Sequence, residues 1–192
     1  MLPMMTMRKI LLSIIFAAYS LGTCVAVGQE VDMGSFEQVK TKTFDKEKFI
    51  FPDDVRGTQL NIFFLAMGAD RDAGEAQQLA LIDWHMALAE RGVFSDAVMP
   101  YHFPVLAGVP FFVKGMINGA MRDTYEGKVP LDQAGILFIK DLAAFAGSAG
   151  LPLDDQATIV IATADAVPLQ FFKGEVSPQG VDEIVAAIEN VL

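Results

Sequence analysis

Cysteine is almost absent from this chain, because Cys24 is the only one among 192 residues. It lies in the N-terminal stretch, behind the basic pair Arg8 and Lys9 and an apolar run at 10–19. This order predicts a secretory signal over residues 1–28. The run is shorter than the roughly 20 residues that a membrane-spanning helix needs. Removal of the signal leaves a mature chain without a thiol or a disulfide, so its core alone must hold the fold.

The processing of this segment is open between three routes. Cleavage can follow Ala26 or Gly28, acylation can modify Cys24 as in a lipoprotein, or the segment can stay as a single membrane anchor. Translation can begin at Met1 or at Met7. Cleavage removes the sulfur and acylation consumes it. We expect an exported protein, periplasmic or secreted, with no membrane attachment beyond this segment.

Basic residues are scarce as well. The chain has 14 Lys and Arg against 24 Asp and Glu, a net charge of −10. Loss of Arg8 and Lys9 with the signal leaves 12 against 24, or −12. Nucleic acids and anionic membranes are bound through a basic surface, which this composition does not supply. The charge is typical of a soluble exported protein, and we expect its partner to be a protein and not a nucleic acid.

The common catalytic motifs are also missing. The two histidines, His85 and His102, are separated by 16 residues and show no HxH or HxxxH spacing, so they are only weak candidates for a metal site. We predict that they are surface or half-buried side chains, and we predict no metal or other cofactor. Ser95 and Ser148 lack the glycine-flanked turn of a nucleophilic serine, and no glycine-rich phosphate loop follows a strand.

Apolar segments and helical repeats alternate along the rest of the chain. Residues 59–67 are apolar nearly throughout, which predicts a strand buried on both faces. Ser177 followed by Pro178 marks the start of the last helix. Pro104 and Pro110 bracket a segment that we expect to be irregular. We predict strands at 49–52, 59–67, 95–99, 136–139, 157–162 and 167–172, and helices at 75–91, 111–122, 142–149 and 178–192.

This order predicts an α/β fold with three layers: a mixed central sheet, helices on both faces, and a closing hairpin and helix. Residues 29–42 are polar and are expected to be a flexible lead-in. Residues 43–192 are expected to form one domain.

Three stretches carry a resemblance to a known superfamily. Residues 51–57 lead through a proline and a glycine into the buried strand 60–65, residues 158–161 and 169–174 form a strand–turn–strand–glycine unit, and a helix from Ser177 closes the chain. In this order they resemble the thioredoxin-like superfamily, in particular peroxiredoxin-like proteins of the alkyl hydroperoxide reductase type. The resemblance implies a thioredoxin-like sandwich over about 43–192.

The resemblance also shows what this chain lacks. In that superfamily the reactive cysteine lies in the loop after the first central strand, where a helix N-terminus lowers its pKa. The matching loop, 67–74, contains no cysteine, and no proline stands at 155–157 where the superfamily has its cis-proline. We therefore expect no thiol-dependent peroxidase or disulfide exchange. The insertion at 101–132 and the last hairpin are similar to mitochondrial ATP-synthase assembly factors, which implies an assembly role.

Two groups of residues are candidates for binding. Asp70, Arg71 and Asp72 occupy the reactive-loop position, either as a polar binding surface or as helix caps. The second group, Phe111, Phe112 and Met116, makes the insertion unusually apolar, either as a partner-binding face or as a helix packed on the sheet.

We predict an exported thioredoxin-like domain without redox cysteines that acts as a non-catalytic binding or assembly module. Two alternatives stay open. One is a non-thiol periplasmic enzyme, assisted by a metal at His85 and His102. The other is a degenerate peroxiredoxin-like oxidoreductase that depends on a cysteine of its partner.

Overall fold

The computed structural model describes residues 34–192, so the predicted signal and Cys24 lie outside the described part. The elements are, in chain order, β1 (Val39–Lys42), β2 (Lys48–Phe51), β3 (Leu60–Ala66), α1 (Arg71–Glu90), β4 (Val98–Ala107), the short 3-10 turn η1 (Phe111–Val113), α2 (Lys114–Tyr125), a second 3-10 turn η2 (Leu131–Gln133), β5 (Leu137–Ile139), α3 (Leu142–Ser148), β6 (Thr158–Thr163), β7 (Pro168–Lys173) and α4 (Pro178–Glu189).

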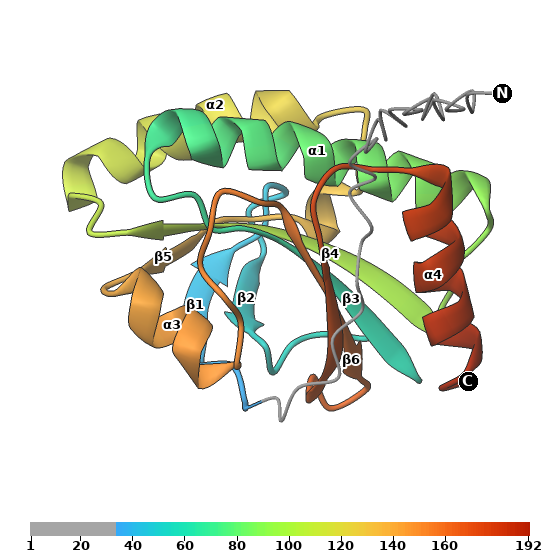
Figure 1. The fold of residues 1–192 in the computed structure, drawn as a ribbon. Helices are drawn as coiled ribbons and strands as arrows, with labels where there is room; N and C mark the ends of the chain where they lie inside the picture. The colour runs from blue at the N-terminus through green and yellow to red at the C-terminus, as the bar shows by residue number, and fades with distance from the viewer. Residues whose placement is uncertain (1–33) are drawn as a thin grey trace, which may run out of the picture.

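The architecture is a three-layer sandwich around a mixed five-stranded sheet of order β5-β4-β3-β6-β7 (Figure 1). β3 pairs parallel with β4 and antiparallel with β6, and β7 closes the sheet as the antiparallel partner of β6. Helices α1, α2 and α4 cover one face, and α3 with the β1–β2 hairpin covers the other. The predicted α/β class, the helices on both faces and the final hairpin and helix are confirmed.

The central strand β3 is buried along its whole length. Its side chains alternate between two cores: Phe63 and Leu65 pack towards β1, β2 and α3, while Ile62 and Phe64 pack towards α1 and α4. A strand that is covered on both faces has no side chain in solvent, so nearly all of its residues are apolar.

Strand β4 differs from the prediction. It runs from Val98 to Ala107 through Pro100 and Pro104, whereas we expected a strand that ended at Met99 and an irregular segment after it. The Gly135 N–H donates to the His102 carbonyl, so the backbone groups of His102 point away from β3. Backbone direction alternates along a strand, so the nitrogens of Pro100 and Pro104 point away from β3 as well. β5 pairs with β4 only from Val105 onwards. The two prolines therefore lie where a missing N–H costs no ladder bond.

The packed domain also begins earlier than expected. Residues 39–42 form β1 and pair with β2, and Phe36 is buried against Phe51 and Phe63. This part of the predicted lead-in is therefore structured. The burial of one aromatic ring outweighs the polar character of its neighbours.

The boundaries of the other elements follow the prediction closely. α1 begins four residues before the predicted start, because Asp70 caps it, with the Ala73 N–H donating to its carboxylate at 2.9 Å. α4 begins at Pro178, and the Ser177 hydroxyl accepts the Gly180 N–H at 3.1 Å. None of the helices in residues 34–192 is both long and apolar enough to cross a membrane.

Candidate functional site

The loop that follows β3 is polar and exposed. Asp70 is the N-cap of α1, and Arg71 and Asp72 are exposed in its first turn. Asp70 therefore has the capping role that the sequence offered as one of two interpretations, and Asp72 favours the positive end of the helix. Whether these three side chains also bind a partner stays a prediction.

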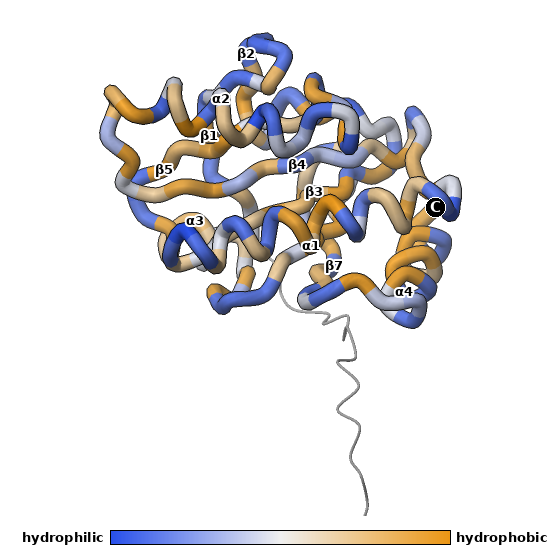
Figure 2. Tube along the Cα trace, turned by 90° about the horizontal axis from the view of Figure 1, so that it is seen from above, coloured by the Kyte–Doolittle hydropathy of each residue, from blue (hydrophilic) through white to orange (hydrophobic). Residues whose placement is uncertain are grey.

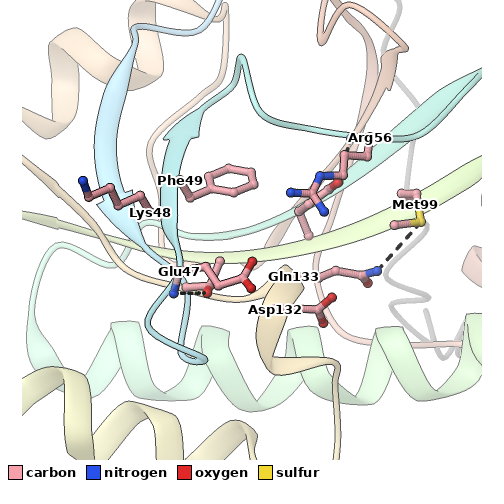
Figure 3. Close-up of a pocket in the computed structure, with 9 residues that line it drawn as sticks. Glu47, Lys48, Phe49, Arg56, Met99, Asp132 and Gln133 are labelled. Carbon is pink, nitrogen blue, oxygen red and sulfur yellow. Dashed lines mark hydrogen bonds between the residues drawn. The ribbon is translucent and has the colours of Figure 1, made fainter.

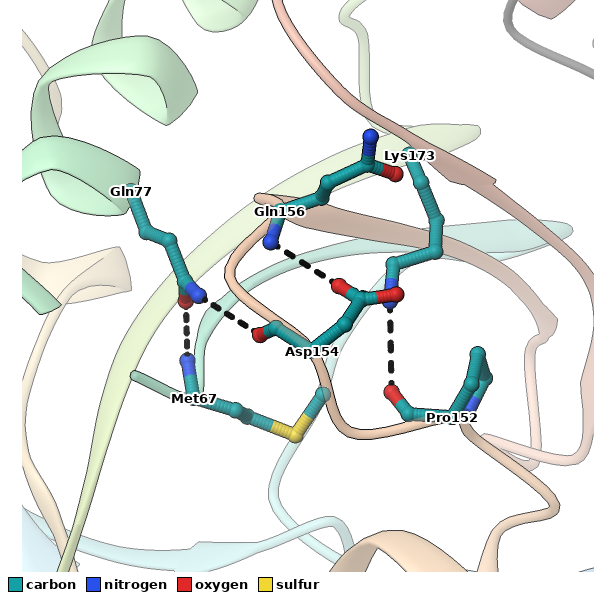
Figure 4. A network of polar contacts seen from close by, with 6 residues as sticks. All are labelled: Met67, Gln77, Pro152, Asp154, Gln156 and Lys173. Carbon is teal, nitrogen blue, oxygen red and sulfur yellow. Dashed lines mark hydrogen bonds and ion pairs between the residues drawn. The ribbon is translucent and has the colours of Figure 1, made fainter. Parts of the chain in front are cut away.

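Behind this loop, a network of hydrogen bonds joins the ends of three strands (Figure 4). Gln77 of α1 accepts the Met67 N–H at 2.6 Å and donates to the Asp154 carbonyl at 3.1 Å. The Asp154 carboxylate pairs with Lys173 Nζ at 2.6 Å and accepts the Gln156 N–H at 2.8 Å. Gln77 is buried, and both the oxygen and the nitrogen of its amide are used in these bonds. The polar groups behind the loop are therefore hydrogen-bonded within the protein, and we call this the closed loop.

The three most exposed large apolar side chains of the described residues lie on η1 and the first turn of α2. Phe111, Phe112 and Met116 are 89%, 82% and 72% exposed. We call these three side chains the apolar surface. Figure 2 shows apolar chain in orange where β4 leads into α2. Lys114, the one charged residue between Asp96 and Arg122, lies over the Phe138 ring at 4.7 Å.

The helix prediction for this segment is confirmed, and of the two interpretations of its apolar residues, packing of Phe111, Phe112 and Met116 on the sheet does not fit their exposure. Tyr125 is the only buried residue of α2, and Ile117 and Met121 are half-buried beneath it. Phe112 and Met116 lie on the other side, in solvent. A helix attached in this way leaves its larger apolar side chains exposed to solvent, which is typical of a site that binds another protein.

The apolar surface and the loop after β3 lie at the same end of the molecule. β3 and β4 run parallel, with Leu60 opposite Val98 and Ala66 opposite Pro104. Their carboxyl ends therefore meet at one end of the sheet, on the left of Figure 1. Open α/β sheets bind their ligands at this end.

The two histidines meet in the interior, although the sequence predicted surface or half-buried side chains. His85 of α1 and His102 of β4 are 6% and 1% exposed, and His102 Nε2 lies 3.0 Å from His85 Nδ1. Phe64 stacks on the His102 ring at 4.3 Å and Phe94 on the His85 ring at 4.8 Å. Within residues 34–192, no third histidine or carboxylate lies near enough to complete a metal site with them.

Burial controls the charge of this pair. It lowers the pKa of His85 to about 4 and the pKa of His102 well below its usual range, where the neighbouring His85 adds to the effect. His102 Nδ1, Tyr125 Oη and Gln78 Nε2 have no hydrogen-bond partner. Burial also raises the pKa of Tyr125. Both histidines are therefore neutral near pH 7, and the pair is a buried polar contact.

A small hollow lies on the opposite face of the sheet (Figure 3). Its volume is about 30 Å³, and Arg56, Asp132, Gln133 and Tyr101 are among the side chains that line it. The Tyr101 hydroxyl accepts the Arg56 N–H at 2.8 Å, and burial raises the pKa of Tyr101. Sites for organic ligands have volumes of about 300–1,000 Å³, so this hollow has room only for a molecule the size of water.

A second, open groove of about 280 Å³ runs between α1 and the start of α4. Ala87, Val176 and Val181 give it an apolar floor, and Arg91 at its rim pairs with Asp182 at 2.6 Å. The one cation at the groove is therefore already paired, and no group of polar side chains converges there.

The mixed five-stranded sheet and the helices that cover it define the class: this chain has a thioredoxin-like fold. No family model and no curated protein matches the sequence. Solved structures do match it in shape. A putative electron transfer protein from Aquifex aeolicus has a TM-score of 0.58 at 10% identity, over 83% of this chain and 98% of its own.

Two further matches belong to the Sco group. BsSco, a member of the Sco family of cytochrome c oxidase assembly proteins, has a TM-score of 0.55 at 11% identity and covers 85% of this chain and 98% of its own. A SCO1/SenC family lipoprotein from Bacillus anthracis has a TM-score of 0.54 at 11% identity, over 82% and 95%. At these identities the likeness shows the fold, which confirms the resemblance found in the sequence.

Proposed function

We propose that this protein is an exported, non-catalytic thioredoxin-like module that binds another protein through the apolar surface formed by Phe111, Phe112 and Met116. The observation that carries the proposal is their exposure, because three large apolar side chains stand in solvent beside a domain that is otherwise well packed. Each contributes about 1.5–3 kcal/mol when a partner buries it. That is enough for a specific but modest complex.

The closed loop after β3 supports the non-catalytic part of the proposal. Gln77 and Asp154 bind each other and the strand ends, and the loop offers no cysteine. The assembly role of the Sco family and the lipoprotein among the matched structures support a role outside the cytoplasm. They carry weight only as analogies of fold.

Capture of partners tests the binding. The purified protein and a variant with Phe111, Phe112 and Met116 replaced by serine are incubated with membranes and extract of the producing cell. We expect the variant to lose the specifically captured protein while it stays folded. Leu79→Ser/Met86→Ser is the matched control, because both side chains are 48% exposed on α1. If the control loses the same protein, or the variant keeps it, the apolar surface is not the binding site.

Turnover assays test the enzymatic alternatives. We expect only background rates with peroxide or with disulfide substrates. A metal-assisted enzyme would instead contain stoichiometric zinc or iron that is lost in His85→Phe or His102→Phe. Metal content of that kind, with turnover that depends on it, would replace the proposal.

A further inference from the structure

The buried histidine pair lies where three elements meet. His85 comes from α1 and His102 from β4, and Tyr125 of α2 packs edge-on against the His102 ring at a centroid distance of 5.7 Å. Seen from above, β4 runs between α1 and α2 (Figure 2). The pair therefore connects the sheet to both helices.

Of these elements, α2 is held least firmly. Tyr125 is its only buried residue, stacked on Phe44 at 5.4 Å. α1 is held by a longer buried face and by the Trp84 indole N–H, which donates to the Gly174 carbonyl at 2.9 Å. Elements with few buried contacts open first when the surrounding structure is weakened. A change at the pair will therefore release α2 before it releases α1.

From this arrangement we propose that the His85–His102 pair is an acid-sensitive clasp: it holds α2 on the sheet while both rings are neutral, and its protonation loosens α2 together with the apolar surface. The inference rests on the proposed function for the role of that surface. It adds a means of regulating the same site.

Protonation of the buried His102 ring has no favourable outcome in either arrangement of the hydrogen bond. If His102 donates to His85, the added proton goes to His85 Nδ1 and breaks the bond, or to His102 Nδ1, which has no acceptor. If His85 donates, a proton added to His102 Nε2 breaks the bond, whereas one added to His85 Nε2 keeps the bond but places the charge on a ring that is only 6% exposed. Each case leaves a buried charge beside the Phe64 and Tyr125 rings.

The surroundings contain no charge that would compensate. β3 contributes Phe64, the loop after α1 contributes Phe94, and α1 contributes Gln78, none of which titrates. From α2, Tyr125 titrates only at high pH. The charged side chains nearest in sequence lie in solvent or pair with one another: Asp83 of α1 and Asp123 of α2 are exposed, and Arg122 of α2 pairs with Glu126 at 3.2 Å. No charged group near the pair would stabilise an imidazolium ion, and the stacked Phe64 and Phe94 rings offer it only a weak attraction.

Hydrogen exchange at several pH values tests the clasp. The protein is used as the cell produces it, and exchange is followed from pH 7 to pH 4.5 after correction for the intrinsic effect of pH on the rate. We expect the protection of α2 amides to fall about tenfold or more, while amides of β3 keep theirs. In the same samples, NMR follows the ring signals of the two histidines, which are the only ones in the chain.

Three variants make the result decisive. In His85→Phe/His102→Phe, α2 should keep its protection at pH 4.5, because apolar rings fill the same space and cannot be protonated. Asp83→Asn removes a titratable group from the exposed side of α1 and should behave as wild type. Phe111→Ser should also behave as wild type, because the clasp does not depend on the apolar surface.

Two results would overturn the clasp. One is α2 protection that is still lost with acid in the double phenylalanine variant. The other, which needs no variant, is α2 protection that stays unchanged in the wild type from pH 7 to pH 4.5. No partner protein is present in this experiment. Its result can therefore be interpreted even if the proposed binding function is wrong.

Discussion

Two neighbouring glutamines in α1 show how differently buried amides can be placed. Gln77 and Gln78 are both buried. Gln77 uses its oxygen and its nitrogen in hydrogen bonds to Met67 and Asp154, whereas Gln78 Nε2 lies close to the Tyr125 hydroxyl without the geometry of a normal hydrogen bond. A buried donor that loses its acceptor keeps the full cost of desolvation, but an unpaired amide contributes little when it is removed.

We therefore expect Gln77→Met to lower the free energy of unfolding by about 1–3 kcal/mol, because the Met67 N–H is then buried without an acceptor. The matched variant, Gln78→Met, should be neutral or stabilising. Urea unfolding of both variants measures the difference. Equal effects would mean that the bonds of Gln77 do not hold the strand ends together.

The histidine pair makes stability depend on pH. Burial places the pKa of His85 at about 4, below its ordinary value of about 6.5. Between these values the unfolded chain binds a proton that the folded protein does not bind. The free energy of unfolding therefore falls as the pH drops from about 6.5 towards 4, and it is insensitive to this group above 6.5.

For His85 alone the loss amounts to about 3 kcal/mol. Urea unfolding at pH 7 and at pH 4.5 measures it in the wild type. Carboxylates also take up protons in this range, so His85→Phe/His102→Phe serves as the reference. We expect a clearly shallower loss in that variant, and the same slope in both proteins would contradict the burial of neutral histidines.

At the scale of the elements, a glycine determines how closely α4 approaches α1. A Cβ at Gly180 would lie 2.5 Å from the fully buried Trp84 ring, whereas one at Gly119 of α2 meets nothing within 4 Å. Alanine favours a helix over glycine by about 1 kcal/mol, but overpacking a core costs about 1–3 kcal/mol. The same substitution should therefore have opposite signs in the two helices.

We predict that Gly180→Ala lowers the midpoint of thermal unfolding and that Gly119→Ala leaves it unchanged or raises it. Thermal unfolding followed by circular dichroism compares them. Stabilisation by Gly180→Ala would show that α4 can move away from Trp84 at little cost, so the close packing of these two helices would not be required.

Strand β4 shows why some elements escape prediction. Prolines normally end a strand, so we expected the strand to end before Pro100 and an irregular segment to lie between Pro104 and Pro110. Pro100 and Pro104 fit because their side of β4 is not yet paired with β5, which is a property of the sheet and not of the strand. Strand β3 could be predicted because its own residues are nearly all apolar, which indicates burial on both faces.

For the whole molecule, the pattern of apolar segments was enough to predict an α/β fold, and the resemblance of three stretches predicted its thioredoxin-like form. They could not reveal the contact between His85 and His102, because α1 and β4 bring together two residues 17 positions apart without any local spacing. They could not decide whether Phe111 and Phe112 pack or protrude, since both states have the same sequence pattern. The sequence identified Asp70, but only the structure showed it as a helix cap.

The molecule as a whole combines a closed loop after β3 with an apolar surface at the same end of the sheet. The fold and the apolar surface together support a protein that acts by binding another protein. The central claim is therefore that a partner covers Phe111, Phe112 and Met116 in the cell.

Photo-crosslinking in the producing cell tests this claim most directly. A photoreactive amino acid replaces Phe112, or, as a control, Ala143, which is exposed on α3 on the opposite face of the sheet. We predict a discrete crosslinked protein from position 112 that is absent from position 143. Crosslinks of equal strength from both positions, or from position 143 alone, would contradict the account.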